Sequence, residues 1–162
     1  MTLFHKLMSR ILHHPNTVAI TIVSTMVMIM LSYNTIIRYG VSWPVILTIL
    51  KVYPLTVLFI YCLRTYVTLP LVLKLHDFFP HHFNKVIPRH VSIPFFVITG
   101  NVTVMMVILT ETHRNLYPYF VPGFMGNWAK TFFVAVPVFF FIVRPIIDYI
   151  FNNLKLKFPR LD

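Results

Sequence analysis

Two pairs of basic residues lie inside long apolar runs, where a charge is costly if the runs enter lipid. Lys51 and Arg64 enclose 12 residues, and Lys130 and Arg144 enclose 13. Asp148 follows Arg144 by four residues, so a helix places both charges on the same face. Because ionisable side chains within membrane helices often mark solute paths, the four cations are candidates for holding an anion, and Asp148 could partly neutralise Arg144.

The same spacing also fits a structural role for the cations. Thirteen helical residues cover about 20 Å, which is less than the hydrocarbon layer of about 30 Å, so both charges start inside it and reach outward. The ten Phe, Val and Ile residues between Lys130 and Arg144 favour insertion by about 3–6 kcal/mol, against about 2.5–3.5 kcal/mol for one central arginine. We therefore expect the helix to insert and the cations to reach opposite headgroup layers.

Hydroxyl groups form a stripe on two of the apolar runs. The intervals of three and four residues average 3.5, which keeps one face toward a partner helix. Small hydroxyl residues let helices approach closely and bond across. The pattern predicts a packing seam between the first and third runs, with a polar lining for a solute path as the alternative. The stripe consists of Thr21, Thr25, Met28, Ser32 and Thr35 in the first run, and of Thr99, Thr103, Met106, Thr110 and His113 in and just after the third.

The remaining titratable residues give little indication of chemistry. Glu111 ends the third run, close to Arg114 in the sequence, and pairing with that residue or with Arg38 is expected. The segment 76–90 holds four histidines without the spacing of a structural zinc site, so an interfacial loop is favoured over a weak metal site. No nucleophile–histidine–acid set, glycine-rich phosphate loop or paired carboxylates can be assembled. We expect no enzyme, no cofactor and no metal.

The composition indicates a membrane protein. The 162 residues are 57% hydrophobic and 11% charged, whereas soluble domains carry about 25% charged residues. The net charge of +10 comes from scattered basic residues. No nucleic acid is expected as a partner, although a polyanion at the inner face is a further alternative.

Four apolar runs are long enough to cross a bilayer as helices, the structure that satisfies the backbone in lipid. They cover 17–37, 44–73, 91–110 and 128–151. Eight basic residues flank the runs on one side and three on the other. The positive-inside rule therefore places both termini in the cytoplasm, with Trp43 and Trp128 at the outer interface.

The chain also repeats itself weakly. An offset of 78 residues pairs Thr21 with Thr99 and Thr25 with Thr103, and an offset of 80 pairs Arg64 with Arg144. Each copy holds two runs, so the copies are parallel to each other. We predict an all-α membrane protein with four transmembrane helices in two tandem hairpins. Its parts are a cytoplasmic or interfacial segment 1–16, a hairpin 17–75, a cytoplasmic linker 76–90, a hairpin 91–152 and a basic cytoplasmic tail 153–162.

One stretch resembles a known family. The residues Val121-Pro122-Gly123-Phe124-Met125-Gly126, followed by Trp128, Ala135-Val136-Pro137 and Arg144-Pro145, are similar to the signature of the bacterial family catalogued as domain of unknown function 2798. The likeness extends over 93–152 and is weaker over 17–76, where Trp43, Pro54 and Pro70 remain. The resemblance implies short helical hairpins with a glycine-containing turn, in the bacterial inner membrane, and no assigned activity.

The functional expectation follows from these patterns. We expect a non-enzymatic, multi-pass protein of the inner membrane that acts through helix–helix or lipid contacts, with membrane lipid and a second copy of the chain as partners. The alternative is a small transporter or channel for an anionic or lipophilic solute. Lys51 and Lys130 separate the two, because only the alternative requires them for function.

Overall fold

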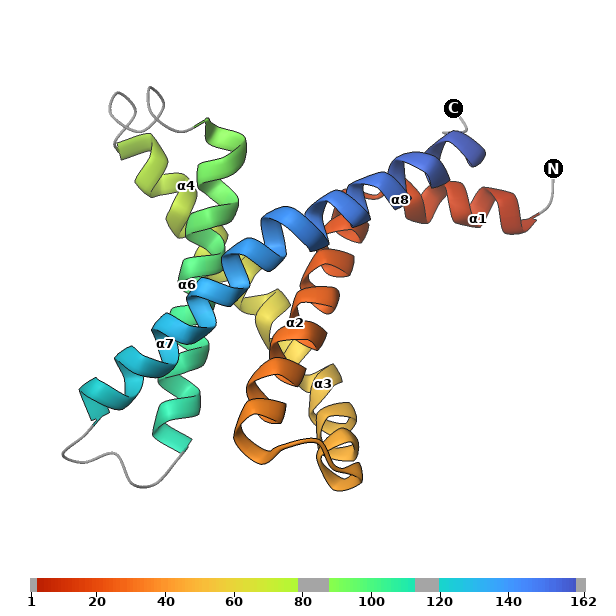
Figure 1. The fold of residues 1–162 in the computed structure, drawn as a ribbon. Coiled ribbons are helices and arrows are strands. Elements are labelled where there is room, and N and C mark those ends of the chain that lie inside the picture. Colours follow the sequence, from red (N-terminus) through yellow and green to blue (C-terminus); the bar gives the residue numbers. More distant parts are fainter. Residues whose placement is uncertain (1–2, 79–87, 113–119, 160–162) are drawn as a thin grey trace. The chain divides into compact units, whose positions relative to one another are not determined.

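The structure is a computed structural model that describes residues 3–78, 88–112 and 120–159, with side chains for 7–14, 16–78, 88–108 and 121–159. All secondary structure in these ranges is helical, which confirms the predicted all-α class (Figure 1). Two segments, η1 and η2, are π-helical. The elements are α1 Leu3–Leu12, α2 Pro15–Tyr39, α3 Trp43–Leu63, η1 Arg64–Thr68, α4 Leu69–Phe78, α6 Arg89–Thr112, α7 Phe120–Pro137, η2 Val138–Val143 and α8 Arg144–Lys157.

Four helical runs are long and apolar enough to cross a membrane. They cover Asn16–Tyr39, Trp43–Phe78, Arg89–Ile108 and Val121–Lys157. The first and third agree closely with the predicted ranges. The second and fourth hold 36 and 37 residues, which as helix measure about 55 Å and exceed the hydrocarbon thickness of about 30 Å.

The second and fourth runs continue as helix beyond their apolar cores, because basic side chains in their last turns interact with the carbonyl groups that have no intrahelical donor. Lys155 and Lys157 lie in the last turn of α8 and His76 in the last turn of α4. Basic groups at these positions interact favourably with the C-terminal carbonyl groups. As a result, helix extends into the predicted linker 76–90 and into the predicted tail 153–162.

Residues 121–126 differ from the turn that the family resemblance implies. They lie in the first turns of α7. Pro122 is tolerated there because the first N–H groups of a helix have no intrahelical acceptor. The turn residue that the structure does show is Gly40, which ends α2 with φ of +73° and donates its N–H to the Ile36 carbonyl at 2.8 Å.

The chain divides into two compact units. The first contains residues 1–53 and 137–162, and the second contains residues 54–136. The boundaries fall at Pro54 and Pro137, so α3 and the fourth run each contribute to both units. This division does not follow the predicted hairpins 17–75 and 91–152, which stay predictions.

The first unit is built on an apolar seam between α2 and the η2–α8 segment. The buried residues of α8 and η2 recur every four positions, at Val143, Ile147 and Phe151, and Leu12 of α1 joins them. Four residues of α2 at helical spacing pack against this cluster, together with residues on either side of it along η2 and α8: Val18, Ile22, Met26, Ile29, Val138, Leu154 and Phe158. A continuous stripe of this kind is what holds two amphipathic helix faces together.

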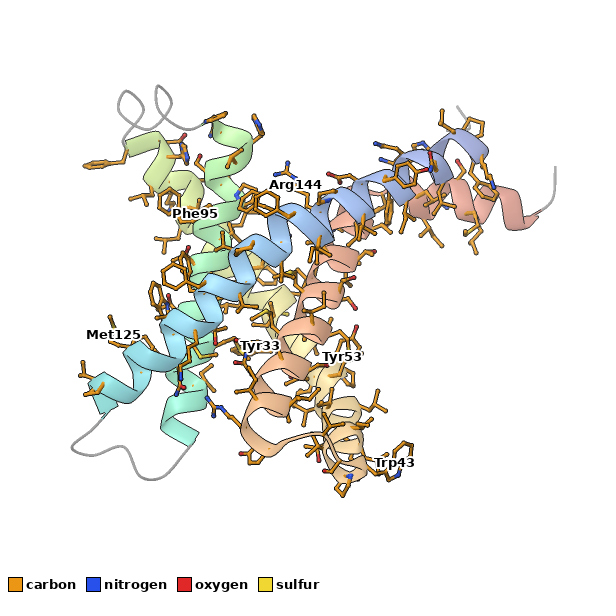
Figure 2. All side chains as sticks on the ribbon, in the orientation of Figure 1. Tyr33, Trp43, Tyr53, Phe95, Met125 and Arg144 are labelled. Atoms are coloured by element: carbon orange, nitrogen blue, oxygen red, sulfur yellow. The ribbon has the colours of Figure 1, made fainter. Side chains whose placement is uncertain are left out.

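A polar contact also ties α3 to α2 within the first unit. The hydroxyl group of Tyr53 is hydrogen-bonded to the side chain of Ser24 and lies 3.3 Å from the Ser24 carbonyl oxygen (Figure 2). Both residues are half-buried. A tyrosine hydroxyl in apolar surroundings is costly without a partner, so this contact fixes the side of α2 that α3 approaches.

The two π-helical segments have the same cause. Each ends one residue before the dipeptides Leu69-Pro70 and Arg144-Pro145. Proline has no N–H to donate, and its ring clashes with the carbonyl four residues earlier. The chain responds by widening: Leu69 donates its N–H to the Arg64 carbonyl and Arg144 donates to the Phe139 carbonyl, each five residues back.

Candidate functional site

In the described part of the second unit, several polar contacts join α6 to α4, η1 and α7. Helix α6 lies beside α4 and η1 on one side and contacts α7 on another (Figure 1). Its polar residues point toward these neighbours, and each neighbour presents a polar group in return. We treat this set of contacts as the candidate functional site, and name it the α6 polar contacts: Thr68 with Asn101, His76 with Ser92, Trp128 with Thr103, and Thr131 with Met106.

A fully buried contact joins α4 to α6. Nε2 of His76 and Oγ of Ser92 share a hydrogen bond of 2.6 Å. The exposed fractions are 5% for His76 and 1% for Ser92. A polar side chain so fully removed from solvent costs free energy unless it is hydrogen-bonded, so the contact specifies which faces of α4 and α6 meet.

The second contact forms where η1 approaches α6. The Thr68 hydroxyl is buried and lies 3.1 Å from Oδ1 of Asn101, with the carbonyl oxygens of Arg64 and Leu63 at 3.3 and 3.4 Å. One hydroxyl hydrogen is therefore shared among several acceptors. The wide π-helical turn exposes these carbonyl groups to Thr68.

Gly100 allows the close approach of α6 to η1. A Cβ atom at this position would lie 3.2 Å from Cγ2 of Thr68, which is tighter than ordinary van der Waals contact. By contrast, a Cβ atom at Gly126 of α7 would meet nothing within 4 Å. Close helix contacts through small residues are typical of membrane helices.

An aromatic cluster and two hydrogen bonds join α6 to α7. Nε1 of Trp128 donates to the Thr103 hydroxyl at 2.9 Å, and the Thr131 hydroxyl donates to Sδ of Met106 at 3.6 Å. The Trp128 ring stacks on Phe132 with centroids 4.9 Å apart, and Phe132 makes an edge contact with Phe95 at 5.8 Å (Figure 2). Such aromatic pairs contribute about 0.5–1.5 kcal/mol beyond the area they bury.

The predicted intramembrane charges are distributed over both units. Lys51 and Arg144 belong to the first unit, and Arg64 and Lys130 to the second. The lysines are exposed and the arginines half-buried. Nε of Arg144 lies 3.8 Å from Oδ2 of Asp148, the partner that the four-residue spacing provides. The side chains of Glu111 and Thr110 lie outside the described residues.

The predicted hydroxyl stripe bonds mainly within its own helices. The hydroxyl groups of Thr21, Thr99 and Thr103 each donate to the carbonyl four residues earlier, at 2.7 to 2.8 Å. Thr103 also accepts the Trp128 hydrogen bond, and Thr25 and Ser32 are half-buried. The stripe therefore needs no solute to satisfy these three threonines. The predicted seam between the first and third runs stays a prediction.

Sequence reasoning missed the contacts between α4, η1 and α6, although the spacing contains them. Thr68 and His76 are eight residues apart, and their partners Asn101 and Ser92 are nine apart in the reverse order. That is how polar residues face each other on antiparallel helices. The sequence alone places His76 in the linker 76–90, together with the acidic and basic residues that follow it.

The chemistry of the site is that of mutual hydrogen bonding. In the described part of the chain, no three His, Cys, Asp or Glu residues come together to hold a metal ion. Of the residues in the weak metal site that the sequence disfavours, His81 and His82 lie outside the described residues. The imidazole, amide, hydroxyl and indole groups of the α6 polar contacts are instead each bonded to a neighbouring helix.

Comparisons with known proteins add no relative: no family model, no curated protein and no solved structure matches this chain. The resemblance of residues 93–152 to the domain of unknown function 2798 family stays a prediction.

Proposed function

We propose that this chain is a four-span protein of the bacterial inner membrane, built from two tandem hairpins with both termini in the cytoplasm. It acts without enzymatic chemistry, through contacts between helices and with lipid, and associates with a second copy of itself. The family resemblance and the distribution of basic residues support the location and the orientation.

The observation that carries the proposal is the division of polar and apolar side chains. Several polar groups of the long runs bond to neighbouring helices, as in the His76–Ser92 and Trp128–Thr103 contacts, and threonines of the stripe bond within their own helices. Large apolar side chains face outward instead: Phe133 is 73% exposed and Phe141 is 80% exposed. Helices arranged in this way are stable in lipid, where an outward apolar surface costs nothing.

Native mass spectrometry of the full chain, released gently from membranes, tests this proposal. We expect two copies of the chain with retained phospholipid. A monomer with a bound small anionic solute would instead favour the alternative of a small transporter or channel, which we call the carrier alternative. A chain that stays dissolved without detergent would contradict the membrane assignment altogether.

A further inference from the structure

Helix α1 presents two different faces. Ser9 and Leu12 are buried, whereas Leu7 is 57% exposed and Ile11 is 46% exposed. Leu7 and Ile11 are four residues apart and therefore lie on one face of the helix. An exposed apolar face on a short helix with basic flanks is typical of helices that lie in the headgroup region of a bilayer.

The buried face of α1 is fixed to α8, near both ends of the chain (Figure 1). The Ser9 hydroxyl donates to the Pro159 carbonyl at 2.9 Å, and Leu12 packs in the cluster formed with Val143, Ile147 and Phe151. These contacts hold α1 in one rotation about its axis. The outward direction of Leu7 and Ile11 is therefore set by the core of the first unit.

A shallow groove runs along this outward face, where α1 meets α2. It has a volume of about 260 Å³, and its walls are almost entirely apolar. The Thr17 hydroxyl donates to the Ile11 carbonyl at 2.7 Å, and Nδ1 of His14 accepts the Asn16 N–H at 3.3 Å, so the elbow between the helices is internally bonded. We call this groove the elbow groove; its lining residues are Leu7, Arg10, Ile11, His14 and Thr17.

The charge around the elbow groove is of one sign. Arg10 is exposed in its lining, and Lys155 and Lys157 lie at the end of α8, which packs on α1. The exposed His14 ring accepts the Asn16 N–H at Nδ1 and leaves Nε2 as a donor toward the groove. Among the described residues of the first unit, Asp148 is the one acidic side chain, and it pairs with Arg144.

We propose that the elbow groove binds an anionic phospholipid of the cytoplasmic leaflet. The lipid phosphate is held by Arg10 and His14, and the start of an acyl chain lies on Leu7 and Ile11. This assignment combines the apolar floor and the basic rim, which a free anion would not use together. The net positive charge around the groove favours a lipid of net negative charge over a zwitterionic one. It rests on the proposed membrane location.

The test uses the full chain in nanodiscs that contain phosphatidylcholine with a minority of phosphatidylglycerol, and native mass spectrometry counts the phosphatidylglycerol retained after release. Each basic residue near an anionic surface contributes about 1 kcal/mol, so Arg10→Gln should weaken retention about fivefold. Arg38→Gln is the matched control, because it removes the same charge at the opposite end of α2. It should leave retention unchanged.

Two further measurements separate the apolar contribution to lipid binding from binding of the phosphate group alone. Leu7→Ser should also weaken retention, whereas Ile37→Ser, at a similarly exposed apolar position near the other end of α2, should not. Inorganic phosphate should not displace the lipid. Equal retention in the Arg10 and Arg38 variants, or displacement by phosphate with no effect of Leu7→Ser, would overturn the proposal. Far-UV circular dichroism checks that each variant is folded.

Failure of this inference is distinguishable from failure of the proposed function. A wild-type chain that inserts into nanodiscs but retains phosphatidylglycerol no better than its Arg10 variant contradicts the elbow groove alone. A wild-type chain that does not enter nanodiscs contradicts both.

Discussion

The His76–Ser92 hydrogen bond makes the sharpest prediction about stability. Replacing Ser92 by Ala removes the hydroxyl group that lies 2.6 Å from Nε2 of a buried imidazole. Losing a hydrogen bond from a buried polar group costs about 1–3 kcal/mol in proteins generally. Between membrane helices the measured coupling is smaller, about 0.6 kcal/mol on average and up to about 1.7. Because both residues are almost fully buried, we expect a coupling near the upper value.

A double-mutant cycle measures this coupling directly. Ser92→Ala, His76→Leu and the double variant are unfolded by sodium dodecyl sulfate in mixed micelles, and helicity is followed by far-UV circular dichroism. The expected result is that the double variant is less destabilised than the sum of the single variants, by about 1–1.7 kcal/mol. Asn153→Ala, at an exposed position in α8, is the control and should not change the midpoint.

The cycle can refute the structural reasoning. Independent sites add to within about 0.3 kcal/mol, so a coupling smaller than that would show that His76 and Ser92 do not interact. In that case α4 and α6 would meet through other faces. The contact between Thr68 and Asn101 would then be in doubt as well, because the two contacts share one helix pairing.

Three further predictions concern the same helices and the charges. Gly100→Leu should destabilise the chain by about 1–3 kcal/mol in the same unfolding assay, because the new side chain meets Thr68. The control Gly126→Ala should leave the chain unchanged or up to about 1 kcal/mol more stable. Equal effects at the two sites would contradict the close approach of α6 to η1. Pro145→Ala should restore a hydrogen bond to the Phe141 carbonyl and abolish the π-helical segment η2, seen as a newly protected amide at residue 145 in hydrogen exchange; rapid exchange of that amide would count against our explanation. Lys51→Gln combined with Lys130→Gln should leave membrane insertion and biological activity intact, measured by membrane fractionation and by complementation of a deletion strain; loss of activity with normal insertion would favour the carrier alternative.

The sequence was sufficient to place the helices, because long apolar runs leave few other structures. The ranges 17–37 and 91–110 match α2 and α6 to within about two residues at each end, the usual uncertainty of helix boundaries. The ends of the second and fourth runs were harder. Their last turns are amphipathic or basic, and such turns remain helical beyond the apolar stretch.

The contacts between helices could be predicted only in part. Arg144 and Asp148 are four residues apart on one helix, so their ion pair could be predicted from the sequence alone. The partner of Trp128 depends on how α7 lies against α6, and the partner of Ser92 depends on the pairing of α4 with α6. Sequence also drew attention to Pro54 and Pro137, whereas the π-helical turns precede Pro70 and Pro145. A proline removes the N–H donor for the carbonyl group four residues earlier. Whether the helix is distorted depends on whether that carbonyl group accepts a hydrogen bond from another donor.

Cysteine accessibility in the full chain tests the central claim most directly. In a Cys62→Ser background, single cysteines replace Ser42, Phe78, Val121 or Leu156, all exposed positions near the ends of the four long runs. We expect a membrane-impermeant maleimide to label positions 42 and 121 in intact spheroplasts, and to label positions 78 and 156 only after lysis. Labelling of positions 78 or 156 in intact spheroplasts would contradict four crossings with both termini in the cytoplasm.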